Sequence, residues 1–153
     1  MGARTSLSYE RIARAEGVEA LIFGPGDFAA SLGAPQLTIG EGEWIYPLTR
    51  IVVAARAFGR QAIDGPHVRL GDADGLRVSA ERSRGLGYDG KWAIHPEQVP
   101  VLNEIFAPTA EEVEQAERIL AAAAEGAARH DGAMVDEATV RMAEAVLARR
   151  PAV

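Results

Sequence analysis

Hydrophobic and polar positions divide the first two thirds of the chain into short apolar runs and longer segments with helical spacing. The short runs, which we expect to be strands, are Val18–Phe23, Gln61–Asp64 and Lys91–Ile94. The longer segments, which we expect to be helices, are Ser6–Glu16, Ile45–Phe58, Leu76–Leu86 and a segment from Pro96 through Phe106. Alternation of this kind predicts βα units and a parallel sheet. The first strand should be buried on both faces, because it is almost wholly apolar.

Local signals mark several element ends. Gly17 is an expected helix stop, since glycine readily adopts the left-handed conformation that ends helices. After the first strand we expect Asp27 to lead a turn, followed by an irregular stretch. Either Asp72 or Asp74 can cap the helix that follows the second strand, because a carboxylate there accepts hydrogen bonds from backbone N–H groups.

The last third of the sequence is helical. Thr109 followed by Glu112 is a capping box, opening a predicted helix from about Ala110 to His130. Asp131-Gly132 then predicts a turn, and Glu137–Arg150 a final helix. We therefore expect two regions, residues 1–107 with the strands and residues 108–153 as a helical extension.

Each predicted strand ends in a polar loop that contains glycine or proline. The loops read GPGD after Phe23, DGPH from Asp64 and HPEQ from His95. In (β/α) barrels the chemistry lies on the loops that follow the strands. Three βα units cannot close a barrel, which needs about eight strands. We therefore expect the chain either to pair with something else or to adopt a different small three-layer fold, and we expect further residues to be missing before Met1.

Composition narrows the class of protein. With 153 residues, 48% hydrophobic and 25% charged, the chain is typical of a globular protein with a sizeable core. A net charge of −6 without a basic run argues against a nucleic-acid partner. The absence of cysteine excludes disulfides and a thiol nucleophile. No stretch resembles a membrane span or a signal peptide, so we expect a cytoplasmic protein.

Three segments together resemble a known family. They are LIFGPGDFAASLG from Leu21, AARAFGRQAIDGP from Ala54 and LGYDGKWAIHPEQVPVLNEIFAPT from Leu86, with GAMVDEA near the end. Jointly they resemble the HpcH/HpaI aldolase and citrate lyase family, and within it the malyl-CoA or β-methylmalyl-CoA lyases. The resemblance implies an α/β fold: about three βα units from the C-terminal part of a (β/α)8 TIM-type barrel in residues 1–107, with an extension or lid in 108–153.

The resemblance also implies a magnesium site. Asp27 matches a family aspartate that binds Mg²⁺ together with a glutamate after the fifth barrel strand. The family loops that contact substrate are matched by Gly26 and by Asp64, Gly65 and Pro66. Mg²⁺ prefers hard oxygen ligands such as carboxylates. Two alternatives stay open: Asp27 can cap a turn, and Asp64 can simply end a strand.

GPGDFA also fits a loose dinucleotide-binding pattern. A proline between the glycines, and the lack of a second strand tipped by an acid, argue against a nicotinamide site.

A second carboxylate, Asp136, matches a family aspartate that reaches over the active site of a neighbouring subunit. The resemblance implies acid/base work on the enol or enolate of the acetyl-CoA fragment, which suits a carboxyl group only where partial burial raises its pKa. The alternative is that Asp136 caps the last helix.

Lys91, the chain's only lysine, falls in the family's GKWxIHP pattern, and we expect His95 in the same pattern to be structural.

Aligning the family's glutamate segment on Ile12 places that ligand at or next to Met1, where it is absent, and an arginine from the early strands is absent too. We therefore expect an Mg²⁺-dependent carbon–carbon lyase acting on a hydroxyacyl-CoA such as malyl-CoA, in a truncated or split form that is inactive alone. A malyl-CoA thioesterase and a non-catalytic scaffold subunit are the alternatives. Expected partners are a CoA thioester and either identical subunits or a separate N-terminal barrel half.

Overall fold

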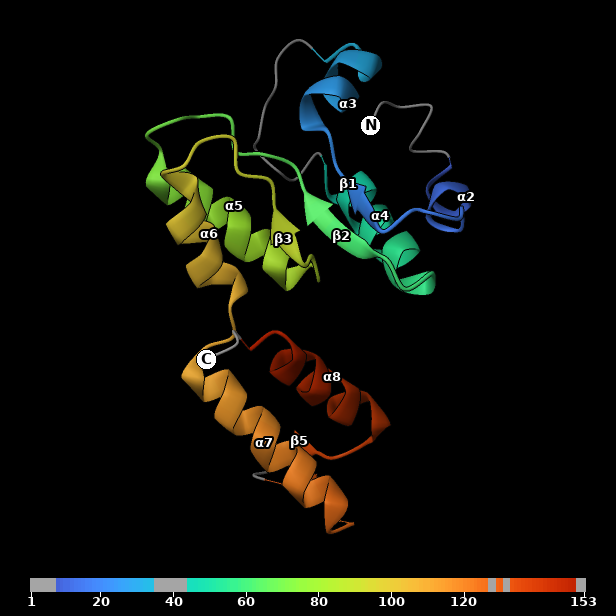
Figure 1. Cartoon of the computed structure of the whole chain (residues 1–153), viewed down its shortest axis with the longest axis vertical. Coiled ribbons are helices and arrows are strands. Elements are labelled where there is room, and N and C mark those ends of the chain that lie inside the picture. Colours follow the sequence, from blue (N-terminus) through green and yellow to red (C-terminus); the bar gives the residue numbers. More distant parts are fainter. Residues whose placement is uncertain (1–7, 35–43, 127–128, 131–132, 151–153) are drawn as a thin grey trace. The chain divides into compact units, whose positions relative to one another are not determined.

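The structure is a computed structural model that describes residues 8–34, 44–126, 129–130 and 133–150. The chain divides into two compact units, Met1–Phe106 and Ala107–Val153. The first holds a small parallel sheet with its helices, and the second holds a helical pair (Figure 1).

The sheet has three parallel strands in chain order: β1 (Ala20–Ile22), β2 (Gln61–Asp64) and β3 (Gly90–Lys91). The predicted parallel sheet and the bounds of β2 are confirmed. β3 is shorter than predicted, since it ends at Lys91 rather than Ile94. Beyond Lys91, the Trp92 amide donates to the Asp64 carbonyl at 3.0 Å, and the Ile94 amide turns to the side chain of Gln98. The chain therefore leaves the sheet one residue after Lys91.

In the described part of the first unit, the helices that accompany the sheet are α2 (Tyr9–Ala13), α3 (Pro25–Leu32), α4 (Ile45–Ala57), α5 (Ala73–Gly85) and α6 (Gln98–Phe106). The α4 and α6 predictions are confirmed. Asp72 is the cap of α5, since its side chain accepts from the Gly75 amide at 3.0 Å. Only the part of the predicted first helix from Ser8 onward lies in the described residues.

The predicted turn led by Asp27 is wrong: Pro25–Leu32 is an eight-residue helix. Pro25 occupies its first turn, where its missing N–H costs no hydrogen bond. The helix ends at Gly33, whose φ of 69° is left-handed.

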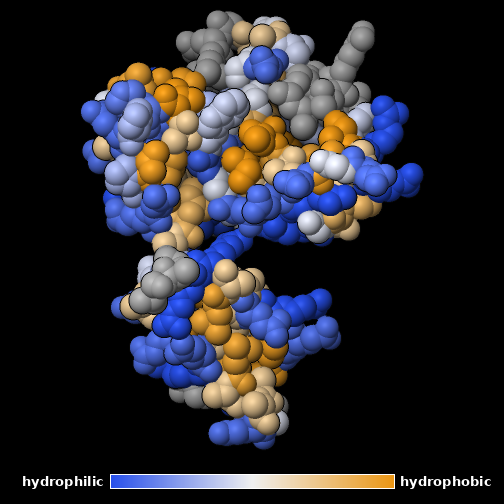
Figure 2. Space-filling view, viewed as in Figure 1, coloured by the Kyte–Doolittle hydropathy of each residue, from blue (hydrophilic) through white to orange (hydrophobic). Residues whose placement is uncertain are grey.

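The two faces of the sheet differ. α4 packs on β1 and β2, and α5 packs on β3, so Leu21 and Ala62 are buried at 1% and 0% exposure. On the opposite face Ile22 is 43% exposed and Trp92 is 54% exposed, and apolar side chains gather over the strands in Figure 2. The prediction that β1 is buried on both faces is therefore wrong in the described part of the chain, where helices cover one face of the sheet only.

The second unit contains α7 (Ala110–Ala124), β4 (Arg129–His130), β5 (Ala133–Met134) and α8 (Glu137–Ala148). The capping box of Thr109 and Glu112 is confirmed. The predicted extension of α7 to His130 is wrong. Gly126 adopts a left-handed φ of 75°, and Arg129–His130 then pairs antiparallel with Ala133–Met134. The predicted turn at residues 131–132 lies outside the described residues.

α7 and α8 pack against each other and leave an apolar groove of about 280 Å³. In Figure 2 apolar side chains run along this helical pair. Within the described ranges, none of the helices combines the length and apolar character that a membrane crossing requires.

Candidate active site

The carboxyl end of β1 leads directly into α3. Gly24 is the N-cap, and Asp27 lies in the first turn, exposed to solvent. A carboxylate there is favoured by the positive end of the helix dipole. The N-cap is Gly24, which has no side chain, so the alternative in which Asp27 itself caps the turn is not what the structure shows. Asp27 is thus an exposed carboxylate at the carboxyl edge of a parallel sheet, and Gly26 precedes it.

The loop after β2 packs tightly against the loop after β1. A Cβ placed on Gly65 would lie 2.4 Å from Pro25 Cδ and 2.7 Å from the Phe23 carbonyl oxygen. Only glycine permits this approach. The structure therefore brings the predicted substrate loop, Gly65 and Pro66, next to the start of the helix that carries Asp27.

Asp64 is buried, with its side chain 4% exposed. Its Oδ2 lies 2.5 Å from Lys91 Nζ and accepts a hydrogen bond from Ser83 Oγ, while its Oδ1 accepts from the Gly65 amide at 2.7 Å. The Lys91 side chain is 3% exposed. The carboxylate is thus occupied by three partners within the chain.

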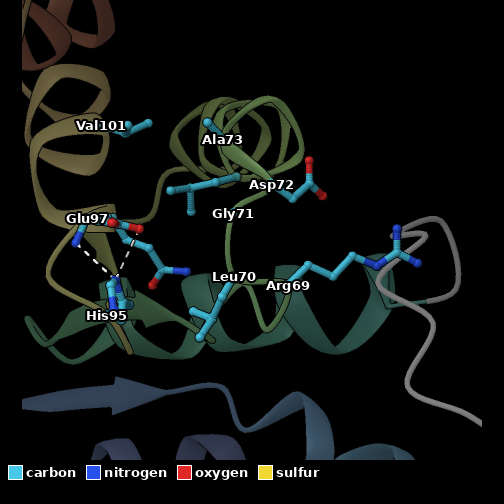
Figure 3. Close-up of a pocket in the computed structure, with 10 residues that line it drawn as sticks. Arg69, Leu70, Gly71, Asp72, Ala73, His95, Glu97 and Val101 are labelled. Atoms are coloured by element: carbon cyan, nitrogen blue, oxygen red, sulfur yellow. Dashed lines mark hydrogen bonds and ion pairs between the residues drawn. The ribbon is translucent and has the colours of Figure 1, made fainter.

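A pocket of about 210 Å³ lies between the segments after β2 and β3 (Figure 3). His95 Nδ1 lies 3.5 Å from Glu97 Oε2 and accepts from the Glu97 amide at 3.3 Å. In Figure 3 the Arg69 side chain extends away from these two residues. The charged groups of this pocket do not converge on one point, which agrees with a structural role for His95.

The buried His67 supports the walls of this pocket. Its Nε2 lies 3.2 Å from Asp72 Oδ2, and its carbonyl accepts from the Gln98 side chain at 2.9 Å. The hydrogen bond from the Gly75 amide is the main cause that lowers the pKa of Asp72, and His67 adds to it. These contacts tie the loop after β2 to the N-termini of α5 and α6.

Asp27 fits magnesium as one ligand of a larger set. Mg²⁺ is usually held by one or two carboxylates, while water and substrate oxygens complete its octahedron. The next carboxylate at this sheet edge, Asp64, is occupied by Lys91. Across the described residues, no three His, Asp or Glu side chains gather in a way that could hold a metal ion. The position of the predicted glutamate ligand, at or next to Met1, lies outside the described residues.

Asp136 is the N-cap of α8 in the second unit. Its Oδ1 accepts from the Thr139 amide at 2.8 Å, and Thr139 Oγ1 accepts from the Asp136 amide at 2.9 Å, which completes a capping box. Asp136 is exposed, and the Thr139 amide holds the pKa of its carboxyl below the ordinary value. The cap alternative is therefore confirmed, and an acid/base role stays a prediction that needs a different environment.

Sequence reasoning missed the partners of Asp64. Lys91 was noted as the only lysine, but nothing linked it to Asp64, which is 27 residues away. Ser83 carried no signal at all. Two ordinary observations could have paired the ions: Asp64 ends one predicted strand and Lys91 begins the next one along the chain, and an aspartate at a strand end in an apolar layer needs a cation.

Two family models match the chain. One, described as HpcH/HpaI aldolase/citrate lyase, matches residues 4–96, and the other, described as C–C bond lyase of the TIM-barrel fold, matches residues 60–152. Among curated relatives, L-malyl-CoA/β-methylmalyl-CoA lyase of Cereibacter sphaeroides is 38% identical over 152 aligned positions, covering 85% of this chain and 48% of the relative. Mitochondrial citramalyl-CoA lyase of Rattus norvegicus is 36% identical, covering 85% and 40%. The chain spans about half the length of these relatives.

Solved structures agree. CitE of Mycobacterium tuberculosis, in complex with magnesium, acetoacetate and coenzyme A, superposes with a TM-score of 0.84 at 31% identity, covering 97% of this chain and 58% of that one. A citrate lyase from Burkholderia xenovorans LB400 superposes with a TM-score of 0.83 at 27% identity, covering 99% and 53%. The parallel sheet, its carboxyl-edge loops and these similarities show that the chain belongs to the HpcH/HpaI aldolase/citrate lyase family.

Proposed function

We propose that this chain forms the C-terminal part of an Mg²⁺-dependent carbon–carbon lyase that cleaves a hydroxyacyl-CoA, such as malyl-CoA, to acetyl-CoA and glyoxylate. The observation that carries the proposal is the exposed Asp27 at the carboxyl edge of a parallel sheet, beside the Gly65–Pro66 loop, in a chain of this family. Relatives named as malyl-CoA and citramalyl-CoA lyases support the substrate class. The magnesium and coenzyme A named for the CitE complex support the cofactor and the thioester.

The residues have distinct roles in this proposal. Asp27 supplies one carboxylate ligand to Mg²⁺, whose positive charge stabilises developing negative charge on substrate oxygens. Gly26, Gly65 and Pro66 shape the loops around the substrate, where small and rigid residues allow close approach. Asp136 manages the proton on the acetyl-CoA fragment.

Asp136 can act as an acid or base only in another environment. Within this chain it is exposed, and its pKa is lowered by the Thr139 amide. Partial burial against a neighbouring active site would raise that pKa toward neutrality. We therefore place its action at the site of a second copy of the chain, which makes a homo-oligomer part of the proposal.

The proposal also requires further strands. The sheet described for residues 8–34 and 44–126 has three strands, and Ile22, Trp92 and Ile94 are exposed at 43%, 54% and 46%. In a closed barrel such side chains face a filled interior. Barrel strands outside residues 1–153, in one polypeptide or as a separate one, would cover this face and supply the second carboxylate ligand and an arginine.

The test mixes the purified chain with a separately expressed N-terminal half of a malyl-CoA lyase, with malyl-CoA as substrate. The chain alone should release no glyoxylate above background, and the mixture should release glyoxylate and acetyl-CoA in a manner that depends on Mg²⁺. A thioesterase would instead release malate and free CoA. Robust turnover by the chain alone would contradict the missing-ligand part of the proposal, and a folded but inactive complex would favour the scaffold alternative.

A further inference from the structure

The family resemblance assigns Asp64 to substrate binding, but its side chain faces the helices. In a parallel pair, residues directly opposite each other lie on the same face of the sheet. Leu21 pairs with Ala62, and both are buried on the helix-covered face. Asp64 is two residues after Ala62 and therefore shares that face, opposite Lys91. Ile22 directly follows Leu21 in β1, so its side chain lies on the opposite, open face of the sheet.

A buried ion pair at this position needs a reason. Removing two charges from water costs several kcal/mol per ion in folded proteins, and the cost is recovered only with close contact and further hydrogen bonds. Here the side chains are 3% and 4% exposed, Lys91 Nζ lies 2.5 Å from Asp64 Oδ2, and Ser83 Oγ donates to the same oxygen. An apolar pair would fill this layer between sheet and helix without that cost.

An apolar pair could not accept a hydrogen bond from the amide of the next residue, Gly65. Asp64 Oδ1 accepts from the Gly65 amide at 2.7 Å in a fully buried hydrogen bond. Gly65 in turn is pressed against Pro25 and the Phe23 carbonyl, so closely that a Cβ would overlap both. Pro25 is in the first turn of α3, two residues before Asp27.

A small cavity lies beside the same group. It measures about 20 Å³ and is bordered by Asp64, Lys91, Ser79 and Pro25 among others. The Ser79 hydroxyl is buried at 0% exposure, without a hydrogen-bond partner among the described residues. A cavity of this size has room for about one water molecule. Such a water would give Ser79 a partner and extend the polar network that surrounds the Asp64–Lys91 pair.

We propose that Asp64 is a positioning residue: the hydrogen bond from the Gly65 amide to its buried side chain, whose charge Lys91 neutralises, fixes the Gly65–Pro66 loop against Pro25, and thereby fixes the first turn of α3 that carries Asp27. Lys91 neutralises and orients the carboxylate, and the second carboxylate oxygen holds the Gly65 amide. Because the Asp64 side chain is engaged in this way, Gly65 and Pro66 are the residues of this loop that contact substrate. The inference rests on the proposed function only for what Asp27 then binds.

The test compares two double variants of the full chain. Asp64→Leu/Lys91→Met removes both charges and the acceptor for Gly65, and apolar replacements of this kind are often tolerated. Asp64→Asn/Lys91→Met removes both charges but keeps a side-chain oxygen for the Gly65 amide. The readouts are thermal unfolding and the amide hydrogen exchange of Gly65 and Phe28 by NMR, with Leu120 in α7 as an internal reference.

We expect Gly65 to exchange about tenfold faster in the leucine variant, as for loss of one buried hydrogen bond, and Phe28 to exchange faster too. The asparagine variant should stay within about twofold of the parent chain at both amides, since its hydrogen bond is retained. Leu120 should be unchanged in both. Equal protection of Gly65 in the two variants would overturn the inference, because the pair would then serve packing alone.

A second variant keeps the inference falsifiable if the leucine variant does not fold. Gly65→Ala leaves the Asp64–Lys91 pair in place but adds a Cβ where Pro25 Cδ is 2.4 Å away. Phe28 should again exchange faster, and unchanged exchange at Phe28 would show that the loop does not control α3. None of these readouts requires activity. A completed enzyme without lyase activity would therefore defeat the proposed function and leave this inference standing.

Discussion

Individual aspartates have different roles at the carboxyl edge of the sheet and at the start of α8. Asp27 is an exposed carboxylate in the first turn of α3, whereas Asp64 is buried on the helix-facing side of the sheet. Asp136 combines a demonstrated cap with a proposed proton-transfer role. Since asparagine caps helices about as well as aspartate, the cap and the chemistry of Asp136 can be separated by one substitution.

In the completed enzyme, Asp27→Asn should weaken Mg²⁺ binding and raise the metal concentration needed for activity, because a negative ligand to a hard cation is lost. Asp136→Asn should leave the Mg²⁺ dependence nearly intact and lower the chemical rate by a factor on the order of 10²–10⁴, as for loss of a general acid/base. The measurement is an Mg²⁺ titration of steady-state turnover. Equal, small effects of both substitutions would leave Asp136 as a cap only and Asp27 as an ordinary surface residue.

Elements of the second unit depend on their first turns. α7 begins with the box of Thr109 and Glu112, and α8 begins with the box of Asp136 and Thr139. In each box the first residue accepts from a backbone amide that has no partner within the helix. The two boxes differ in one respect, since the cap of α7 is a neutral hydroxyl and the cap of α8 is a carboxylate.

The stability that Asp136 gives to α8 should therefore depend on pH. The Thr139 amide lowers the pKa of Asp136 in the folded state. Its stabilisation is present above the unfolded pKa, near 3.8, and is lost as pH falls through the lower folded pKa. Thermal unfolding followed by circular dichroism between pH 7 and pH 2 should show a shallower acid decline for Asp136→Asn than for the parent chain. Identical acid profiles would show that the carboxylate charge contributes nothing to the cap.

At the scale of the whole molecule, the described structure leaves apolar surface uncovered. On the open face of the three-stranded sheet Ile22 and Trp92 are 43% and 54% exposed, and beyond the sheet Ile94 is 46% exposed. Met134 and Met142 in the second unit are 65% and 69% exposed. Parallel sheets are normally covered on both faces. Sheet edges and apolar patches of this kind promote association.

The isolated chain should accordingly self-associate. Light scattering should report an average mass that rises with concentration. Trp92→Glu, on the open face, should reduce that rise, while the matched change Glu97→Gln, at an exposed residue outside this face, should not. A stable monomer at high concentration, with cooperative unfolding, would contradict this prediction.

Pattern alone predicted the parallel sheet, the order of its elements, the bounds of β2 and the course of α4 and α6. Those features follow from short-range causes: hydrophobic periodicity, caps and glycine stops act over a few residues and are visible in the sequence. The three family segments also indicated Asp27 and the Gly65–Pro66 loop as candidate site residues, and GAMVDEA indicated Asp136. The end of α7 was misjudged, because an alanine-rich segment favours helix up to the point where Gly126 and the β4–β5 pairing end it.

Only the tertiary structure decided which face of each strand packs against the helices. That arrangement also decided the structural role of Asp64. A strand residue points to one face or the other according to register, and register is set by pairing with strands tens of residues away. The same pairing brings Lys91 and Ser83 to Asp64, and brings Gly65 within contact of Pro25. The sequence by itself determined which residues could form an active-site edge. Only the folded arrangement of strands decided that Asp27 faces solvent there, while Asp64 is turned inward to hold the loop beside it.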